Sequence, residues 1–569
     1  MNEVGAFAEH FPELDFLLRF LTGPALPPSV PLGWTDEALA SLPSEEIETL
    51  YLYGTGRWYE GSTLLDWLAA DGERDLVFFE EKIEMLRLFA NSPAALRLIR
   101  SPRVHIRFLM DPRDRERFID ESAVTFPREK IAFIPSPFYE KTKPALCRTM
   151  RLHLMRRTTM HHAIETDNAF YHVLSRNLIA NIPKAGDAFY VNRFAGAFNA
   201  TPAIICGAGP SLNRTLGLLR QKKKGALLFA GGSAITALSR AGILPHFAIA
   251  IDPNEEERER FRRAALQKTP LLYTGRLHPG VFPFVSGPLG YIRAGTGGPL
   301  EEWLEKELGI EPLPLAEGFD PEALSVTTTC LEVATMMGCS PIILVGVDLA
   351  FTDGMPYADG VLENLRPISR KEKKRETRVS EQLLIRKGTG GKRVRTLVKW
   401  VMESEAISRF AKANPNVTYL NGTPEGLGFP DIPYVPLDTL PLSPLPPDGK
   451  IEELITRHRL LCQGSKAVAR LREALEECRE IVHKAVRETE GPSPRSDALL
   501  FYDLELRDLP IFEACLHRPT HGMWRRFARI CGRHTQDNAE KLFALMKWRE
   551  YEALITYYLK SLQDMDKIG

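Results

Sequence analysis

A glycine-rich turn near the middle of the chain has the residue types of a phosphate-binding loop. The apolar run AIIC (203–206) is followed by the turn GAGPS (207–211). Two glycines let backbone N–H groups approach a ligand closely, and the N-terminus of a following helix favours an anion. The turn lacks the GK[ST] of a P-loop and the third glycine of the dinucleotide fingerprint. The sequence therefore leaves two interpretations of this turn open. It is either a nucleotide-binding loop or an ordinary tight turn from strand to helix. Its candidate ligand contacts are Gly207, Gly209, Pro210 and Ser211.

Carboxylates close two other apolar runs. Asp252 ends the run FAIAID, and Asp348 ends the run PIILVGVD. A carboxylate at the end of a strand can hold a ribose or sugar hydroxyl, a metal ion or a helix N-terminus. Ser325 and Thr327 precede a helix-like stretch, where they are either ordinary N-terminal capping residues or hydroxyl donors to a phosphate. Two further candidates for ligand binding also follow apolar runs, and they are Ser233 and Asn421.

Residues 201–436 alternate between strand-like and helix-like segments, and the candidates lie between these segments. Short, continuous apolar runs between helices argue for a parallel sheet that is covered on both faces. In such doubly wound sheets, ligands bind beyond the carboxyl ends of the strands. We therefore expect an α/β fold that gathers the candidates at one edge of a central sheet.

The length of 569 residues predicts about three or four domains, at roughly 100–200 residues each. We expect a smaller N-terminal α/β, Rossmann-like domain over 1–190 and a central catalytic domain over 191–440. Residues 450–569 lack strand signals and show long helical patterns, so an all-α C-terminal domain is expected there. The proline-rich stretch 436–449 suits a stiff linker, because proline fixes φ and removes a backbone donor.

The N-terminal block carries a weaker signal of the same kind. The run TLYLY is followed by Gly54 and Gly56, and a second apolar run ends at Glu80. This spacing is similar to that of a nucleotide-binding half-unit whose acidic residue holds a ribose. A degenerate copy of such a unit, in which the same residues are only structural, is the competing interpretation.

One segment is strongly basic. Residues 366–395 read RPISRKEKKRETRVSEQLLIRKGTGGKRVR. Such a run is either a solvated loop or an electrostatic lid that attracts an anionic donor or an acidic acceptor.

Composition excludes several classes of protein. Lys plus Arg and Asp plus Glu both number 73, so the net charge is zero and a protein that coats nucleic acid is not expected. The chain contains no run of about 18 apolar residues, so we expect no membrane span. Glu3 stands where a signal peptide carries positive charge, so we expect no secretory signal. The eight cysteines are scattered and form no CxxC, which favours reduced thiols in the cytoplasm. No HExxH or GxSxG pattern occurs, so we expect no metal site built on histidines and no hydrolase elbow.

Several longer motifs follow one another in a recognisable order. They are PAIICGAGPSLNRTL, ALSRAGILPHFAIAIDP, SVTTTCLEVATMMGCSPIILVGVDLAFTDG, GGKRVRTLVKW and VTYLNGTPEGLGF. In this order they resemble the motility-associated-factor (Maf-type) glycosyltransferases, which share a domain with an archaeal 6-hydroxymethylpterin diphosphokinase (MptE-like). The GPSL turn is also similar to that of bacterial sialyltransferases. The resemblance covers about residues 195–430, and VFFEEKIEMLRLFANSPAALRLIRSPRVHIRFL looks like the N-terminal region of the family.

The resemblance implies a central sialyltransferase-like domain and a function in flagellin glycosylation. Such an enzyme moves a nonulosonic, sialic-acid-like sugar from a CMP-activated donor to Ser or Thr of flagellin, with no cofactor besides the donor. Gly207, Gly209 and Ser211 would then hold the nucleotide phosphate, with hydroxyl contacts from Ser325 and Thr327. Asp252, Asp348 and Asn421 would hold nucleotide or sugar hydroxyls. The helical C-terminal domain would serve flagellin capture or homo-oligomerisation.

The catalytic base is the point at which this chain departs from the family. After DLAFTDG the family commonly has a histidine, which serves as the base in the sialyltransferase-like enzymes, and this chain has Tyr357. Asp353 and Tyr357 are the remaining candidates for the base, and Asp348 is a further candidate for a catalytic role. A tyrosine with the usual pKa of about 10 is a poor base near pH 7.

Two other functions stay open. A Mg-ATP-dependent 6-hydroxymethylpterin diphosphokinase would use Asp252 and Asp348 as metal ligands. A non-catalytic flagellar accessory protein would keep the fold and bind flagellin without a nucleotide; Tyr357 in place of histidine favours that alternative.

Overall fold

The chain forms two compact units. A computed structural model describes residues 3–23, 33–34, 47–58, 62–126, 128, 130–319, 325–361, 383–440, 442, 445, 449–492, 495–520 and 536–566. The first unit comprises Met1–Glu165, Ser369–Leu384 and Leu397–Lys399, and the second comprises Thr166–Ile368, Ile385–Thr396 and Trp400–Gly569. The division into three domains expected from the sequence stays a prediction.

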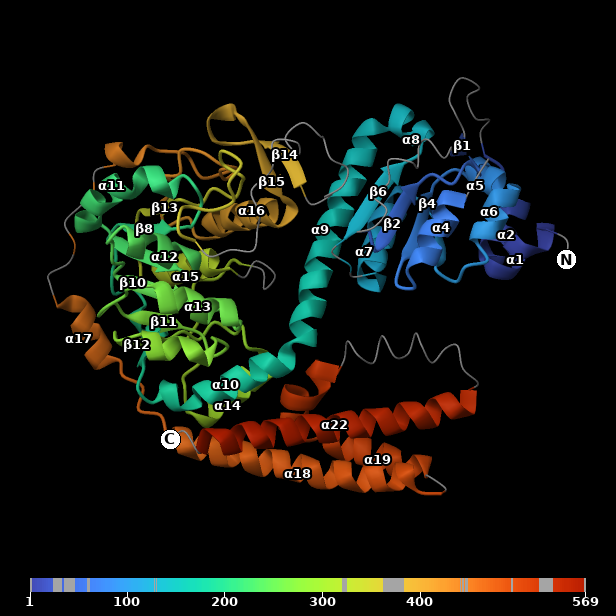
Figure 1. Ribbon diagram of the computed structural model, residues 1–569. Helices are drawn as coiled ribbons and strands as arrows, with labels where there is room; N and C mark the ends of the chain where they lie inside the picture. The colour runs from blue at the N-terminus through green and yellow to red at the C-terminus, as the bar shows by residue number, and fades with distance from the viewer. Residues whose placement is uncertain are drawn as a thin grey trace. The chain divides into compact units, whose positions relative to one another are not determined.

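The first unit is built on a four-stranded parallel sheet in the order β5-β4-β2-β6 (Figure 1). Its strands are β2 (Thr49–Tyr53), β4 (Asp75–Glu80), β5 (Val104–Phe108) and β6 (Ile131–Pro135), and a separate short pair joins β1 (Gly33–Trp34) to β3 (Arg57–Trp58). The helices are α1 (Glu3–His10), α2 (Pro12–Phe20), α4 (Ser62–Ala70), α5 (Ile83–Ala90), α6 (Pro93–Leu98), α7 (Pro112–Thr125), α8 (Pro137–Thr142) and α9 (Pro144–Ala169).

The second unit contains an eight-stranded sheet in the order β16-β13-β8-β9-β10-β11-β12-β7, with every pair parallel. The strands are β7 (Phe189–Tyr190), β8 (Ala203–Cys206), β9 (Leu227–Gly231), β10 (Phe247–Ala250), β11 (Leu271–Tyr273), β12 (Leu289–Tyr291), β13 (Ile342–Val345) and β16 (Tyr419–Asn421). Every residue of β8, β9, β10, β11 and β13 is buried, because helices cover both faces of the sheet.

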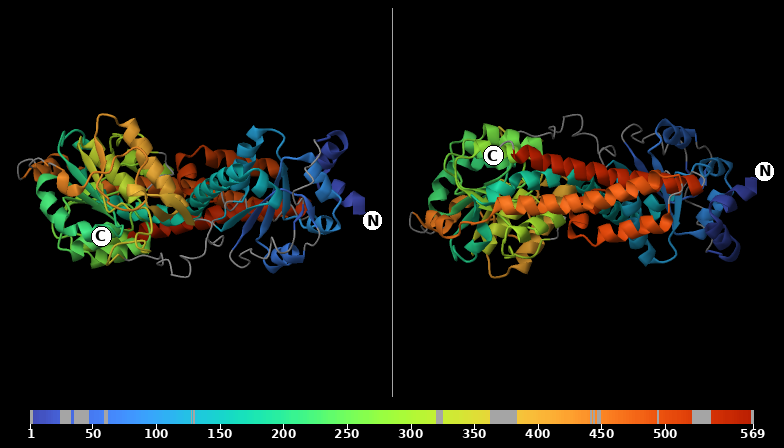
Figure 2. Two further views of the ribbon diagram at one scale, coloured as in Figure 1. Left: turned by 90° about the horizontal axis from the view of Figure 1, so that it is seen from above. Right: turned by 90° about the horizontal axis from the view of Figure 1, so that it is seen from below.

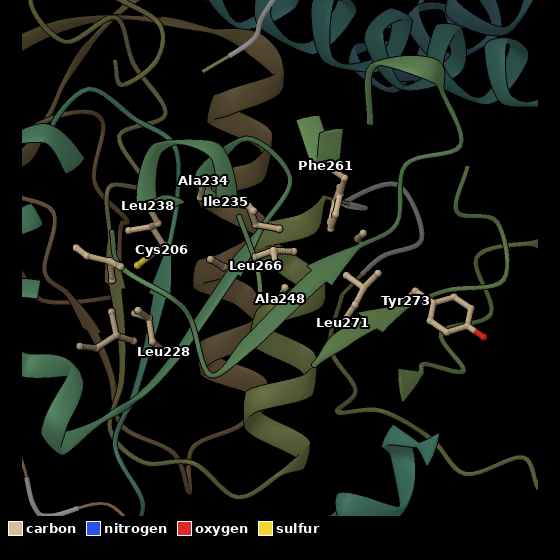
Figure 3. Packing of buried hydrophobic residues seen from close by; sticks show 14 of the residues in the cluster. Cys206, Leu228, Ala234, Ile235, Leu238, Ala248, Phe261, Leu266, Leu271 and Tyr273 are labelled. Atoms are coloured by element: carbon tan, nitrogen blue, oxygen red, sulfur yellow. The ribbon is translucent and has the colours of Figure 1, made fainter. Parts of the chain in front are cut away.

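Alternate residues of each strand enter one of two hydrophobic layers. Ile204 and Leu228 pack with α11 (Leu212–Lys222), α12 (Ser233–Arg240) and α13 (Glu255–Arg263) on one face, the layer shown in Figure 3. Ile205 and Phe229 pack on the other face with α15 (Val326–Met336), α16 (Val398–Ala413) and α17 (Lys450–Arg457). The predicted fold class, a doubly wound α/β fold with a smaller N-terminal α/β part and a helical C-terminal part, is confirmed.

The C-terminal part consists mainly of three helices of the second unit. They are α18 (Gly464–Glu490), α19 (Ser496–Arg507) and α22 (Gln536–Asp566), with the short α20 (Pro510–Phe512) and α10 (Tyr171–Ala185) against them. Helices α18 and α22 lie side by side in Figures 1 and 2. None of the helices in the described ranges has the length and apolar character that crossing a membrane requires.

The helical pattern expected over residues 450–569 is interrupted near its start. Between α17 and α18, the N–H of Leu460 donates to the carbonyl of Ala188 and the N–H of Tyr190 donates to the carbonyl of His458. This segment therefore adds an antiparallel bridge to the edge of β7, although no strand is expected after residue 450. The unpaired backbone donors and acceptors of the edge strand β7 therefore determine the local structure there, rather than the helical pattern of the sequence.

The predicted linker is partly packed on the core. Leu437 and Leu440 are buried in the layer that contains α11. The ammonium group of Lys222 donates to the carbonyls of Asp438 and Leu440. These contacts fix the start of the proline-rich stretch against the sheet domain.

Two buried glutamates of α14 (Gly298–Glu307) bond to the loop after β11 and to the end of β12. Glu301 accepts hydrogen bonds from the N–H groups of Gly275 (3.0 Å) and Gly297 (2.8 Å). Glu305 accepts from the Tyr291 hydroxyl (2.7 Å) and forms an ion pair with an Arg293 guanidinium nitrogen (2.9 Å). Burial, and secondly the charge of Glu301, raise the pKa of Glu305 to about 7.

This raised pKa predicts a pH dependence of stability. A glutamate in the unfolded chain loses its proton near pH 4.3, whereas Glu305 keeps it in the folded state up to about pH 7. The unfolded state therefore binds fewer protons between these values, and the free energy of unfolding falls as pH rises through them. Glu332, whose pKa burial also raises to about 7, acts in the same direction. We expect wild type to lose about 3 kcal/mol relative to Glu305→Gln between pH 4.5 and 7. Urea unfolding of both proteins at a series of pH values measures this, and parallel curves would contradict it.

Candidate functional site

The winding of the sheet reverses between β8 and β13. From β8 the chain adds β9, β10, β11 and β12 on one side, and it later places β13 and β16 on the other. The loops that follow β8 and β13 therefore leave in opposite directions and open a crevice at the carboxyl ends of the strands. The sequence candidates 207–211 and Asp348 lie in these two loops.

Asp348 joins the two loops. Its carboxylate accepts the N–H (3.1 Å) and the hydroxyl (2.5 Å) of Ser211, and also the hydroxyl of Thr352 (2.6 Å). Its side chain is buried at 1% exposure. Burial raises the pKa of Asp348, and the hydrogen bonds from Ser211 and Thr352 lower it in part. The carboxylate therefore joins the two loops through three hydrogen bonds, and its catalytic role stays a prediction.

The glycines of the β8 loop make room for this contact. A Cβ atom at Gly209 would overlap Oδ1 of Asp348, and one at Gly207 would overlap the carbonyl oxygen of Gly346. The N–H groups of Gly207 and Gly209 donate to the carbonyls of Val345 and Gly346, while Pro210 has no N–H to offer. The amides of this turn are therefore used mainly to bind the β13 loop. The loop has fewer donors for a phosphate than the predicted cradle would need.

Two helix N-termini meet at the end of β9. A Cβ atom at Gly231 would overlap Cγ1 of Val326, which places the first turn of α15 over the start of α12 at Ser233. Ser325 caps α15, because its hydroxyl accepts the Thr328 N–H at 3.1 Å and donates to Glu403 at 2.7 Å. The first N–H groups of an α-helix have no acceptor within the helix. The part-exposed Thr327 lies in this first turn of α15, where unpaired N–H groups favour an anion.

Asp252 lies further along the same edge, at the end of β10. Its carboxylate pairs with Arg260 of α13 at 3.2 Å, and its backbone carbonyl accepts the N–H of His278. Arg260 also pairs with the buried Glu257. The structure therefore places Asp252 in the ion network of α13, two strands away from β8.

Asp353 lies on the rim of the crevice. Arg214, from the first turn of α11, forms ion pairs with Asp353 (2.6 Å) and with Glu425 (2.8 Å). Tyr357 is partly buried in the following turn, whose Ala358 N–H donates to the carbonyl of Ala208. Asp353 therefore is a solvent-accessible carboxylate beside the turn that follows β8.

A pocket of about 520 Å³ adjoins the crevice beyond β13. Asn421, at the end of β16, lines it together with Ser404 and Glu405 of α16. The remaining walls come from Val401 of α16 and from 386–391 and 427–434. Of the predicted basic segment, 366–382 lies outside the described residues. Its remainder forms β14 (Leu383–Lys387) and β15 (Arg393–Leu397), whose connecting turn is the pocket wall.

The sequence does not predict three parts of this site, which are Arg214, Glu425 and the turn 388–391. The run KGTGG signals a tight turn, but it lies inside a segment that we interpreted by charge alone. Nothing in the sequence places Arg214 between two acidic loops, because its partners are 139 and 211 residues away along the chain.

The acidic residue of the N-terminal block is bound within the protein. Glu80 is fully buried and accepts the N–H (2.7 Å) and hydroxyl (2.9 Å) of Thr55 and the hydroxyl of Tyr139. Gly54 and Gly56 have positive φ angles, and a Cβ atom at Gly54 would overlap the Ser136 hydroxyl. The structural interpretation of this block is favoured, because Glu80 is used to bind the loop that would hold a ligand.

The fold and the crevice define an α/β protein of the doubly wound class. Residues 176–354 match the family described as MptE-like (6-hydroxymethylpterin diphosphokinase MptE-like), which confirms the resemblance to that family for this segment. The chain is also similar to a solved structure of the MAf glycosyltransferase from Magnetospirillum magneticum AMB-1, with 15% identity and a TM-score of 0.49 over 99% of this chain and 96% of that one. No curated protein matches the chain.

Proposed function

We propose that this chain is a cytoplasmic glycosyltransferase that moves a nonulosonic sugar from a CMP-activated donor to a Ser or Thr hydroxyl of flagellin. The observation that carries the proposal is the meeting of the α12 and α15 N-termini at the end of β9, beside a pocket of about 520 Å³. An anion site next to a pocket of this size suits a phosphate linked to a sugar. The order of the sequence motifs and the MptE-like match over 176–354 support the same class.

The proposed reaction is substitution at the anomeric carbon. The bond from that carbon to the CMP phosphate breaks, the bond to the acceptor oxygen forms, and the acceptor loses its proton. The helix N-termini stabilise the charge that develops on the departing phosphate. Asp353 is our candidate for the base, because its carboxylate lies exposed on the rim, where Arg214 orients it.

The C-terminal helices are our candidate for the contact with flagellin. Helix α19 exposes Leu500, Phe501 and Leu504, which are 60%, 63% and 55% accessible. Apolar side chains that adjoin one another on a surface often mark a protein-binding site. All seven cysteines in the described residues are free, in keeping with the proposed cytoplasmic setting.

The diphosphokinase alternative is less well supported. It would need Asp252 and Asp348 as metal ligands. The carboxylate of Asp348 already accepts three hydrogen bonds within the protein, and Asp252 is paired with Arg260. A metal ion would have to displace these partners.

Thermal unfolding with CMP, with Mg-ATP and without nucleotide tests the proposal. A ligand that binds only the folded state at about 100 times its Kd raises the free energy of unfolding by about 2.7 kcal/mol. We expect CMP to do so. Thr327→Glu places a negative charge at the first turn of α15, where the helix dipole tolerates it but a phosphate does not, and should remove the CMP effect. Ser496→Glu puts the same charge at the first turn of α19 and should leave it unchanged.

The other outcomes of this measurement favour the two alternative functions. Stabilisation by Mg-ATP alone would favour the diphosphokinase, and no stabilisation by any nucleotide would favour the accessory protein. If CMP stabilises the chain, a mass increase of flagellin after incubation with a CMP-nonulosonate measures the transfer itself.

A further inference from the structure

A second group of polar side chains gathers at the carboxyl ends of β11 and β12. The loop after β11 contributes Thr274 and Arg276, the loop after β12 contributes Thr296, and α14 begins two residues later at Gly298. Helix α10 packs against α14 at this place (Figure 1). Strand β11 is the third strand from β8 in the sheet, so with about 4.8 Å between strands the group lies roughly 15 Å from the β8 loop.

Arg276 is a buried cation whose hydrogen-bonding capacity is only partly used. The residue is 7% exposed. One terminal nitrogen donates to the carbonyl of Thr296 at 3.2 Å, and the other lies 3.8 Å from the carboxylate of Asp167, which is itself 62% exposed. The Nε of Arg276 meets no partner within the described residues. A buried guanidinium with an N–H to spare favours a further acceptor, above all an oxyanion.

A second arginine lies over the first turn of α14. A Cβ atom at Gly298 would overlap the guanidinium of Arg518, whose Cζ lies 5.9 Å from the centre of the Tyr171 ring. Arg518 is exposed and forms no ion pair with any residue that the structure describes. The N-terminus of a helix carries a partial positive charge, which repels a cation and attracts an anion. A bound anion would therefore stabilise Arg518 in this position.

The start of α14 also offers uncharged donors. Among the described residues, the structure shows no acceptor for the N–H of Gly298. The Thr296 hydroxyl is buried and meets no described partner, and the same holds for the hydroxyl of Thr274 at the end of β11. Gly295, next to Thr296, is exposed, so a small ligand can reach this turn from solvent.

Two acidic groups lie near these donors. Asp167 is the exposed partner of Arg276 at 3.8 Å. Glu301 lies on the buried side, where its carboxylate accepts the N–H groups of Gly275 and Gly297. Burial raises the pKa of Glu301, which favours its neutral form. The charges of Arg276 and Arg518 are therefore only partly balanced within the described part of the chain.

We propose that the start of α14 binds a phosphate group, held by Arg276, Arg518, the N–H of Gly298 and the hydroxyl of Thr296. A phosphate has enough acceptor oxygens for these donors, and arginine can pair with it through two parallel hydrogen bonds. The ligand is free phosphate or a phosphate monoester of a small molecule, because both present the same group. This site is separate from the crevice and does not depend on the proposed function.

Isothermal titration calorimetry of the full chain with inorganic phosphate and with glycerol 3-phosphate, at constant ionic strength, tests the proposal. We expect wild type to bind; tighter binding of the ester indicates a phosphorylated small molecule, and tighter binding of phosphate indicates the free ion. Arg518→Glu should weaken this binding by about tenfold, the loss of one charge-assisted hydrogen bond. Thr296→Val keeps every charge and should weaken it by about fivefold. Arg220→Glu, the matched control, makes the same charge change on an exposed arginine in the last turn of α11 and should change it by less than about twofold.

Three results would overturn the proposal: no binding of either ligand to wild type, an equal loss in Arg518→Glu and Arg220→Glu, or loss of the binding in Thr327→Glu, which alters the crevice instead. Titration of the same variants with CMP separates this inference from the proposed function. CMP binding that survives Arg518→Glu supports a separate phosphate site. CMP binding lost in that variant would overturn the inference and assign the start of α14 to the nucleotide. Phosphate binding by a chain that does not bind CMP would refute the proposed function alone.

Discussion

Asp348→Ala is expected to lower the free energy of unfolding of the second unit by about 3 to 5 kcal/mol. The substitution removes a buried acceptor and leaves the N–H and hydroxyl of Ser211 and the hydroxyl of Thr352 without their partner. Relief from burying a charge offsets part of this loss. The remaining cost is large because the three donors belong to buried residues and lose the acceptor that they bond in the folded protein.

Urea unfolding followed by circular dichroism measures the effect, with two comparison variants. Asp348→Asn keeps the volume and one acceptor oxygen, and should fall between wild type and Asp348→Ala. Asp353→Ala removes a carboxylate five residues away that makes an exposed ion pair, and should cost less than about 1 kcal/mol. Equal losses for Asp348→Ala and Asp353→Ala would show that Asp348 does not join the two loops.

Gly231→Ala is expected to displace the N-terminus of α15 and to abolish the stabilisation by CMP. The added Cβ atom would overlap Cγ1 of Val326, and the backbone carbonyl of Ile249 lies 3.0 Å from it on the other side. Since the strand cannot yield, the helix must move, at a cost of about 1 to 3 kcal/mol for overpacking. The first turn of α15, at which we propose that the phosphate binds, is then displaced from the end of β9 and the start of α12.

A second substitution checks this mechanism. Val326→Ala removes the overlapping methyl groups, so Gly231→Ala with Val326→Ala should regain most of the stability and of the CMP effect. The coupling energy from the double-mutant cycle should be favourable and above about 0.5 kcal/mol, as for residues in direct contact. A double variant no better than Gly231→Ala alone would place the damage elsewhere, at the contact with Ile249.

The fold of the central region follows from local patterns. AIIC, FAIAID and PIILVGVD are apolar throughout, because both faces of each strand are covered. The polar residues that follow them mark the carboxyl edge of a parallel sheet, so the place of the site could be inferred without coordinates. The cap at Ser325 was equally local, since a cap involves only its own first turn.

The roles within the site could not be derived in the same way. A strand-end aspartate such as Asp252 or Asp348 has the same signature whether it meets a ligand or an internal donor. The partners of Asp348 lie 137 residues before it and 4 residues after it, and only the adjacency of β8 and β13 brings Ser211 to it. Glu80 shows the same ambiguity, resolved by its contact with Tyr139, 59 residues away.

The sequence by itself determined the doubly wound sheet, the edge at which its loops gather and the resemblance to a family, because strand and helix patterns and short motifs are properties of neighbouring residues. Only the tertiary structure decided that the GAGPS amides bond to the β13 loop, that the first turn of α15 packs against the end of β9, and that 386–391, Asn421 and α16 line one pocket. Those outcomes depend on which distant groups lie close enough to form a hydrogen bond with each N–H and each carboxylate. A buried polar group must find such a partner, and the order of strands in the sheet determines which partners are within reach.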